Sequence, residues 1–164
     1  MKHPIVNIAQ LEFRANEHGD RFGSRIGAVG PMVGAQKLGY NVTVVPPGKR
    51  AFPLHNHRVN EEMFFILEGM GEVRIGDARH PIQQGDIIAC PPGGPETAHQ
   101  IVNTSGAELK YLAVSTWVYP ELVEYPDSKK FGILADMGAG PDGKLQRFRF
   151  LGRPDGSLEY YDGE

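Results

Sequence analysis

The feature that most constrains the fold is a series of short strand-forming runs between residues 40 and 118. These runs are rich in β-branched and aromatic residues, and glycines or prolines stand between them, which is typical of short strands joined by tight turns. Seven or more strands at such close spacing predict an all-β barrel or a double-sheet jelly roll. The expected strands cover residues 40–45, 50–57, 62–67, 71–75, 78–83, 86–90, 99–102 and 109–118.

The two ends of the chain are less regular than this central region. Near the N-terminus we expect an edge strand at Pro4–Ala9, and the six glycines between Gly19 and Gly39 disfavour a long helix. Near the C-terminus, residues 130–134 and 145–151 are further strand candidates.

We expect extended chain at Tyr119–Pro120 and at Tyr125–Ser128, with one short helical turn between them. A chain of 164 residues is most simply one domain. We therefore expect a single domain over residues 1–164, with the barrel core at about 40–118 and with 1–39 and 119–164 as extensions that pack on the barrel.

Composition narrows the function classes. A net charge of −3 argues against a nucleic-acid partner, for which a basic surface is expected. No apolar run approaches the roughly 20 residues that cross a bilayer, so a membrane partner is not expected either. Because Cys90 is the only cysteine, an intrachain disulfide is impossible and a cytoplasmic location is expected.

Three histidines and one glutamate form a candidate metal site. His55 and His57 are two residues apart, so on a strand their side chains point to the same face. Glu62 begins the next apolar run, and His99 begins another. Since imidazole and carboxylate groups are common ligands of divalent cations, their arrangement on adjacent strands makes a metal site plausible.

These residues belong to two stretches that resemble the paired motifs of the cupin superfamily. The first motif resembles the pattern of a glycine, His-x-His, a glutamate and a second glycine, formed here by Gly48, His55, His57, Glu62 and Gly69. The second resembles the pattern Gly, Pro-x-Gly, His and Asn, formed here by Gly85, Pro91, Gly93, His99 and Asn103. One extra residue before His55 and a longer gap between Gly93 and His99 depart from that pattern.

The amino-acid sequence of these stretches is similar to that of small bacterial single-domain cupins of unassigned function. The resemblance implies a conical β-barrel, or double-stranded β-helix, that commonly forms a homodimer. It also implies one divalent metal ion per chain, held by His55, His57, Glu62 and His99. The donor set suits Fe, Zn, Mn or Ni and does not choose among them.

The first functional hypothesis is a metal-dependent enzyme that acts on a small polar metabolite. Cupins include dioxygenases, isomerases and decarboxylases, and the sequence does not choose among these reactions or identify a catalytic residue outside the metal ligands. The alternative is a non-catalytic cupin that binds or senses a small ligand, because fold alone does not fix function.

Neighbouring polar residues have simpler interpretations. Glu61 is expected to face solvent, and Glu96 with Thr97 to lie in a solvated loop. Arg50 is either a contact for an anionic substrate or a rim charge. Cys90 is expected to be a buried small apolar residue.

Overall fold

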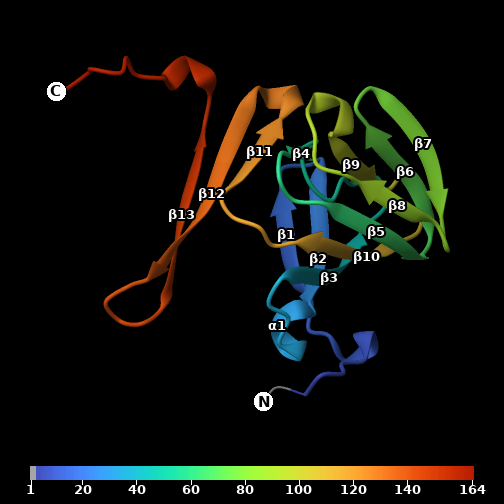
Figure 1. Cartoon of the computed structure of the whole chain (residues 1–164). Helices are drawn as coiled ribbons and strands as arrows, with labels where there is room; N and C mark the ends of the chain where they lie inside the picture. The colour runs from blue at the N-terminus through green and yellow to red at the C-terminus, as the bar shows by residue number, and fades with distance from the viewer. Residues whose placement is uncertain (1–2) are drawn as a thin grey trace.

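The computed structural model describes residues 3–164, and antiparallel β-strands dominate it (Figure 1). The helical segments are short: α1 (Gly30–Val33) and the 3-10 turns η1 (Ile8–Gln10), η2 (Pro95–Thr97), η3 (Pro126–Ser128) and η4 (Pro154–Gly156). The strands are β1 (Arg14–His18), β2 (Phe22–Ala28), β3 (Leu38–Val45), β4 (Asn56–His57), β5 (Glu62–Glu68), β6 (Met70–Ile75), β7 (Ala78–Gln83), β8 (Ile87–Cys90), β9 (His99–Val102), β10 (Leu109–Thr116), β11 (Glu121–Tyr125), β12 (Lys130–Ala139) and β13 (Leu145–Gly152). Within residues 3–164, no helix has the length and apolar character that a membrane-spanning helix requires.

The strands form three antiparallel sheets. The largest has the order β1-β2-β3-β10-β5-β8, and the others have the orders β13-β12-β11-β4 and β7-β6-β9. Single bridges from Arg50 to Val102 and from His55 to His99 connect β9 to the irregular segment that precedes β4. This arrangement confirms the predicted all-β cupin-type barrel of the jelly-roll class.

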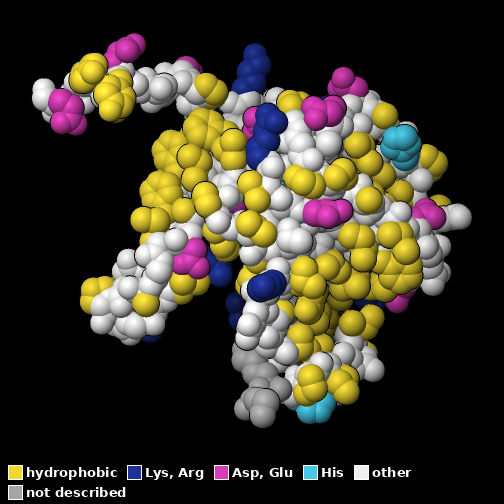
Figure 2. Space-filling model, in the orientation of Figure 1, with side chains coloured by type: hydrophobic (Ala, Val, Ile, Leu, Met, Phe, Trp, Pro, Cys, Tyr) yellow, Lys and Arg dark blue, Asp and Glu magenta, His cyan; other side chains and the backbone are white. Residues whose placement is uncertain are grey.

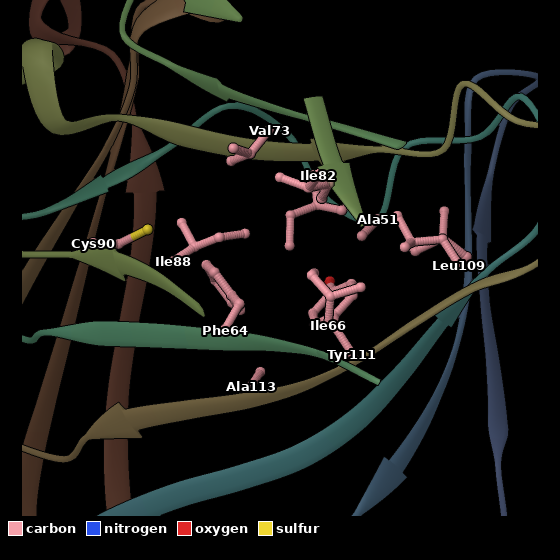
Figure 3. Close-up of a cluster of buried hydrophobic side chains, with 12 residues drawn as sticks. Ala51, Phe64, Ile66, Val73, Ile82, Ile88, Cys90, Leu109, Tyr111 and Ala113 are labelled. Carbon is pink, nitrogen blue, oxygen red and sulfur yellow. The ribbon is translucent and has the colours of Figure 1, made fainter. Parts of the chain in front are cut away.

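A large apolar cluster fills the barrel (Figure 3), and a smaller one is formed by Leu11, Val29 and Val42. Phe64 and Ile66 alternate on β5 and point into the large cluster, where they meet Tyr111 of β10. Burying side chains of this size stabilises the fold by about 1.5–3 kcal/mol each relative to exposure. Since Glu62 shares their face of β5, the strand that anchors the core also carries a carboxylate into the barrel.

Two glycines of the motifs lie where a side chain would collide with neighbouring atoms. Gly69, between β5 and β6, has a φ of +84°, and a Cβ there would collide with the backbone oxygen of Glu108. At Gly93 a Cβ would lie 2.6 Å from the side chain of Thr97, and the Gly93 backbone N–H donates to the carbonyl of His57 at 2.8 Å. The second motif therefore anchors the strand that carries the first motif's histidine.

The N-terminal region departs from the sequence-based expectation. The strand predicted at Pro4–Ala9 is wrong, because Ile8–Gln10 forms a 3-10 turn in which the side chain of Asn7 accepts a hydrogen bond from Ala9 N–H at 2.9 Å. Instead, β1 and β2 form a hairpin that extends the sheet of β3. The glycines of β2 concealed this strand, since glycine is unfavourable in strands on local propensity alone.

The segment from Arg50 to His57 is mostly irregular, and only Asn56–His57 forms a strand. Pro53 lies in the middle of the segment and has no N–H to donate to a ladder, which explains the short strand.

The expected helical turn between Pro120 and Tyr125 is wrong. Glu121–Tyr125 is β11, which pairs with β4 and β12, and the 3-10 turn follows it at Pro126–Ser128. In this register Val123 lies opposite His57, so the C-terminal region contributes directly to the surroundings of the histidine motif.

The hairpin of β12 and β13 extends away from the barrel (Figure 1). We call residues 130–152 the C-terminal arm. Apolar side chains gather on its surface (Figure 2), and those of Phe148, Phe150 and Leu151 are more than two-fifths exposed.

Candidate metal centre

The fold brings His55, His57, Glu62 and His99 together at one end of the apolar cluster. His57 ends β4, Glu62 begins β5 and His99 begins β9, while His55 forms the bridge to His99. One potential ligand atom from each residue lies within 4.8 Å of those of the other three. The four residues selected from the sequence therefore form one compact group with the donor types that bind divalent metals.

The Nε2 atoms of the three histidines converge on one oxygen of Glu62. Glu62 Oε2 lies 2.9 Å from His99 Nε2, 3.5 Å from His57 Nε2 and 3.7 Å from His55 Nε2. Both nitrogens of His57 are buried and lack a hydrogen-bond partner. A buried imidazole without such a partner is costly, and a cation at this point would satisfy its nitrogen.

The Nδ1 atoms of His55 and His99 face backbone carbonyls. His55 Nδ1 lies 2.9 Å from the carbonyl oxygen of Pro53, and His99 Nδ1 lies 3.3 Å from that of Thr97. A carbonyl oxygen only accepts, so we assign the proton of each neutral ring to Nδ1. The lone pair on each Nε2 then points to the centre of the group, as metal-binding imidazoles require.

The protonation of the group also favours a cation. Burial raises the pKa of Glu62, but the three surrounding imidazoles outweigh burial and hold that pKa well below its usual range. Burial lowers the pKa of His99, and Glu62 only partly compensates. His99 Nε2 and Glu62 Oε2 lie at hydrogen-bond distance, 2.9 Å, so the two groups share a proton. A metal ion that binds here would displace this proton.

Sequence reasoning missed Glu121, which is 2% exposed and lies behind His57. Its Oε2 atom is 3.6 Å from His57 Nδ1. The same carboxylate accepts backbone N–H bonds from Arg58 at 3.1 Å, Val59 at 3.2 Å and Asn60 at 2.8 Å. The alternation of Glu121 with Val123 on β11 could have indicated an inward-facing carboxylate.

Glu121 also affects the charge of His57. Burial lowers the pKa of His57, but the negative charges of Glu62 and Glu121 outweigh burial and raise it. Carboxylates behind ligating histidines orient the ring and increase its basicity in metal sites. Glu121 has the position of such an outer partner.

The group is open to solvent on one side. The side chains of His55, His57 and Glu62 are each 17% exposed, whereas that of His99 is 3% exposed. The Tyr125 ring stacks beside His55 at 6.2 Å, and the Phe64 ring lies 5.5 Å from His99. Three of the four side chains are therefore partly exposed, and the Tyr125 ring flanks the group beside His55.

Other residues considered from the sequence lie outside this group. Glu61 is exposed, as expected. Glu96 accepts a hydrogen bond from Gly94 N–H at 2.9 Å and stabilises its own loop. Asn103 is buried and donates to the carbonyls of Val45 and Ala107, so it holds a turn. Cys90 is buried, and burial together with the charge of Glu62 raises its pKa to about 12.

Comparisons with known proteins agree with the fold. Residues 41–115 match the Cupin domain family. A solved structure described as a sugar phosphate isomerase from a cupin superfamily, from Silicibacter pomeroyi, superposes with a TM-score of 0.76. It is 25% identical, and the match covers 97% of this chain and 98% of that one.

Two curated relatives each match a little over two-fifths of this chain. An uncharacterized protein of Methanocaldococcus jannaschii is 36% identical over 72 residues, which are 44% of this chain and 54% of that protein. An oxalate-binding protein of Thermotoga maritima is 34% identical over 70 residues, which are 43% of this chain and 54% of that protein. The match thus spans about half the length of each curated relative.

Proposed function

Since the chain is a small cupin-domain protein, we propose that His55, His57, Glu62 and His99 hold one divalent metal ion at which a small polar metabolite is transformed. The observation that carries this proposal is the convergence of three imidazole Nε2 atoms on one carboxylate oxygen. The same donor set suits Fe, Zn, Mn or Ni. When bound, such an ion supplies Lewis-acid chemistry, or redox chemistry in the case of iron.

The residues around the centre have separate roles in this proposal. The backbone carbonyls of Pro53 and Thr97 keep a proton on Nδ1 of His55 and His99, which leaves both Nε2 lone pairs available. Glu121 holds the ring of His57 from behind. The partly exposed ring of Tyr125, which stacks beside His55, forms an apolar wall against which a substrate is positioned.

The substrate class that fits the centre is a small molecule with oxygen donors, such as a hydroxy acid or a sugar derivative. Two relatives support this class, since one is described as a sugar phosphate isomerase and another as an oxalate-binding protein. Isomerisation, decarboxylation and oxygenation are all compatible with the donor set.

The enzymatic proposal is tested by measuring whether turnover is lost on chelation and recovered when a metal ion is restored. Untagged protein is assayed against panels of sugar phosphates and small carboxylic acids before and after chelation, and each of the four ions is then restored. Turnover that disappears on chelation and returns with one ion supports the enzyme. If no panel member turns over with any ion, the enzymatic proposal is wrong.

A non-catalytic ligand-binding protein is the second candidate, favoured by the oxalate-binding relative. In that case a small carboxylate binds without being converted. Binding of oxalate that survives chelation, together with unchanged oxalate after long incubation, would support this candidate over the enzyme.

We also propose that the protein forms a homodimer through its C-terminal arm. The strand β13 is at the edge of its sheet, and Phe148 and Phe150 expose apolar surface there. Unpaired edges and apolar patches of this kind are commonly covered by a second subunit. Light scattering should give twice the 18.0 kDa chain mass, and a monomer would contradict the proposal.

A cytoplasmic location, without a nucleic-acid or membrane partner, completes the proposal. It is supported by the single cysteine and by the net charge of −3. Fractionation of the source cells followed by immunodetection tests the location, and recovery with the membranes would contradict it.

A further inference from the structure

A cavity lies between the β1–β2 hairpin, the segment 50–54 and the start of β12. Its volume is about 580 Å³, and cationic side chains of Arg21, Arg50 and Lys130, together with His18, contribute to its lining. A cavity of this size accommodates a small metabolite.

In the part of the chain that the structure describes, no acidic side chain of the cavity lining neutralises these positive charges. The acidic residue in the lining, Asp127, has both carboxylate oxygens occupied by Arg74, at 3.0 and 2.9 Å. Among residues 3–164, no carboxylate lies within ion-pair distance of Arg21, Arg50 or Lys130, and Lys130 lies over the Tyr125 ring at 5.5 Å. Three cations thus surround a cavity in a chain whose net charge is −3.

We propose that this cavity binds a small phosphate monoester. Two guanidinium groups and an ammonium group provide the many N–H donors that a phosphate dianion accepts, and arginine suits its geometry especially well. Phe22 and Phe52 also line the cavity and offer apolar surface to the organic part of the ligand. A phosphate group with a compact organic body therefore matches both parts of the lining.

The cavity is a different site from the metal centre. None of His55, His57, Glu62 and His99 lines it. Gln100 does line it, and because Gln100 follows His99 on β9, their side chains point to opposite faces of the strand. The proposal therefore does not depend on the metal or on catalysis.

Backbone hydrogen bonds hold the walls of the cavity together. Arg50 N–H donates to the carbonyl of Arg21 at 3.0 Å, and Gly23 N–H donates to the carbonyl of Arg50 at 3.1 Å. Since these bonds involve only main-chain atoms, the arginine side chains can be replaced while the wall remains in place. Arg50 also lies five residues before His55, so a bound phosphate would contact the segment that leads into the metal centre.

Calorimetric titration of inorganic phosphate into the full-length protein tests the proposal. The protein is first stripped of metal with a chelator and desalted, so that phosphate cannot bind a metal ion. We expect saturable binding that weakens at least about tenfold in Arg50→Gln and in Arg21→Gln, because each removes a charged donor from the dianion. Citrate, a tricarboxylate of higher negative charge, should still bind more weakly than phosphate, because its planar carboxylates do not match a tetrahedral phosphate site.

Two matched variants complete the design. Arg79→Gln removes an exposed arginine that pairs with Glu72 outside the cavity, and it should bind phosphate as the unmodified chain does. His55→Ala should also retain phosphate binding, which separates this site from the metal centre. The proposal is overturned if no saturable binding occurs up to about 10 mM phosphate. Unchanged affinity in both arginine variants, a loss in His55→Ala, or tighter binding of citrate would overturn it equally.

Discussion

Glu121 Oε2 lies 3.6 Å from His57 Nδ1, on the side of the imidazole ring opposite Glu62. The same buried carboxylate accepts the backbone N–H groups of Arg58, Val59 and Asn60, which are the residues that connect β4 to β5. One side chain from the C-terminal region therefore holds both a histidine of the centre and the turn that follows it. Through this contact, the C-terminal region positions a histidine of the candidate metal centre.

Replacement of Glu121 tests this role. Glu121→Gln keeps the volume but places an amide N–H₂ among backbone donors, so we expect the free energy of unfolding to fall by about 1–3 kcal/mol. Because outer partners of ligating histidines tune metal binding, metal affinity should fall about 10- to 100-fold. Urea unfolding and metal titration measure the two effects. Glu72→Gln, at an exposed ion pair, is the control, and equal results for both variants would contradict the assigned role.

The raised pKa of His57 predicts how metal affinity depends on pH. The imidazolium form cannot bind a cation, so its proton must leave before Nε2 becomes a ligand. Affinity should rise with pH through a midpoint above that of an ordinary imidazole, and Glu121→Gln should move this midpoint down. Zinc titrations between about pH 5 and pH 8 measure it. A midpoint that does not move in the variant would contradict the contribution of Glu121.

The core predicts a clear stability contrast between two isoleucines. Ile66 is fully buried in the apolar cluster, whereas Ile87 is 70% exposed. Ile66→Ala should lower the free energy of unfolding by about 2–5 kcal/mol, because it leaves a cavity in a packed core. Ile87→Ala should change it by less than about 0.5 kcal/mol. Chemical denaturation of both variants checks the difference, and similar values would contradict the assigned core.

The thiol of Cys90 is expected to be unreactive in the folded chain. Burial and the charge of Glu62 raise its pKa to about 12, so the thiolate is scarce at neutral and mildly alkaline pH. Alkylation by iodoacetamide at about pH 8 should be slow in the native protein and fast after unfolding. Mass spectrometry follows the added group, and rapid modification of the native chain would contradict this expectation.

The part of the centre that the sequence could predict depends on local alternation. His55, His57, Glu62 and His99 lie on or beside short strands, where the period of two decides which side chains share a face. The positions of the barrel strands could be predicted from the same alternation and from glycines in turns, such as Gly69. These are short-range properties, and for that reason they are visible in one sequence.

The features that escaped prediction depend on contacts between distant segments. Glu121 lies on a strand flanked by Pro120 and Pro126, and the prolines at both ends favoured a short helical turn in the sequence over a strand. Its partner His57 is far away in sequence, so only the register of β11 and β4 reveals the pair. Arg21 and Arg50 meet at their cavity for the same kind of reason. The single-domain organisation over residues 1–164 stays a prediction.

Elemental analysis of untagged protein tests the central claim most directly. The unmodified chain is compared with His55→Ala, which removes one ligand, and with His80→Ala, which removes an exposed histidine on β7. We predict close to one equivalent of Fe, Zn, Mn or Ni in the unmodified chain and in His80→Ala, and little metal in His55→Ala. Equal metal content in all three proteins, or no metal in the unmodified chain after reconstitution, would contradict the metal centre.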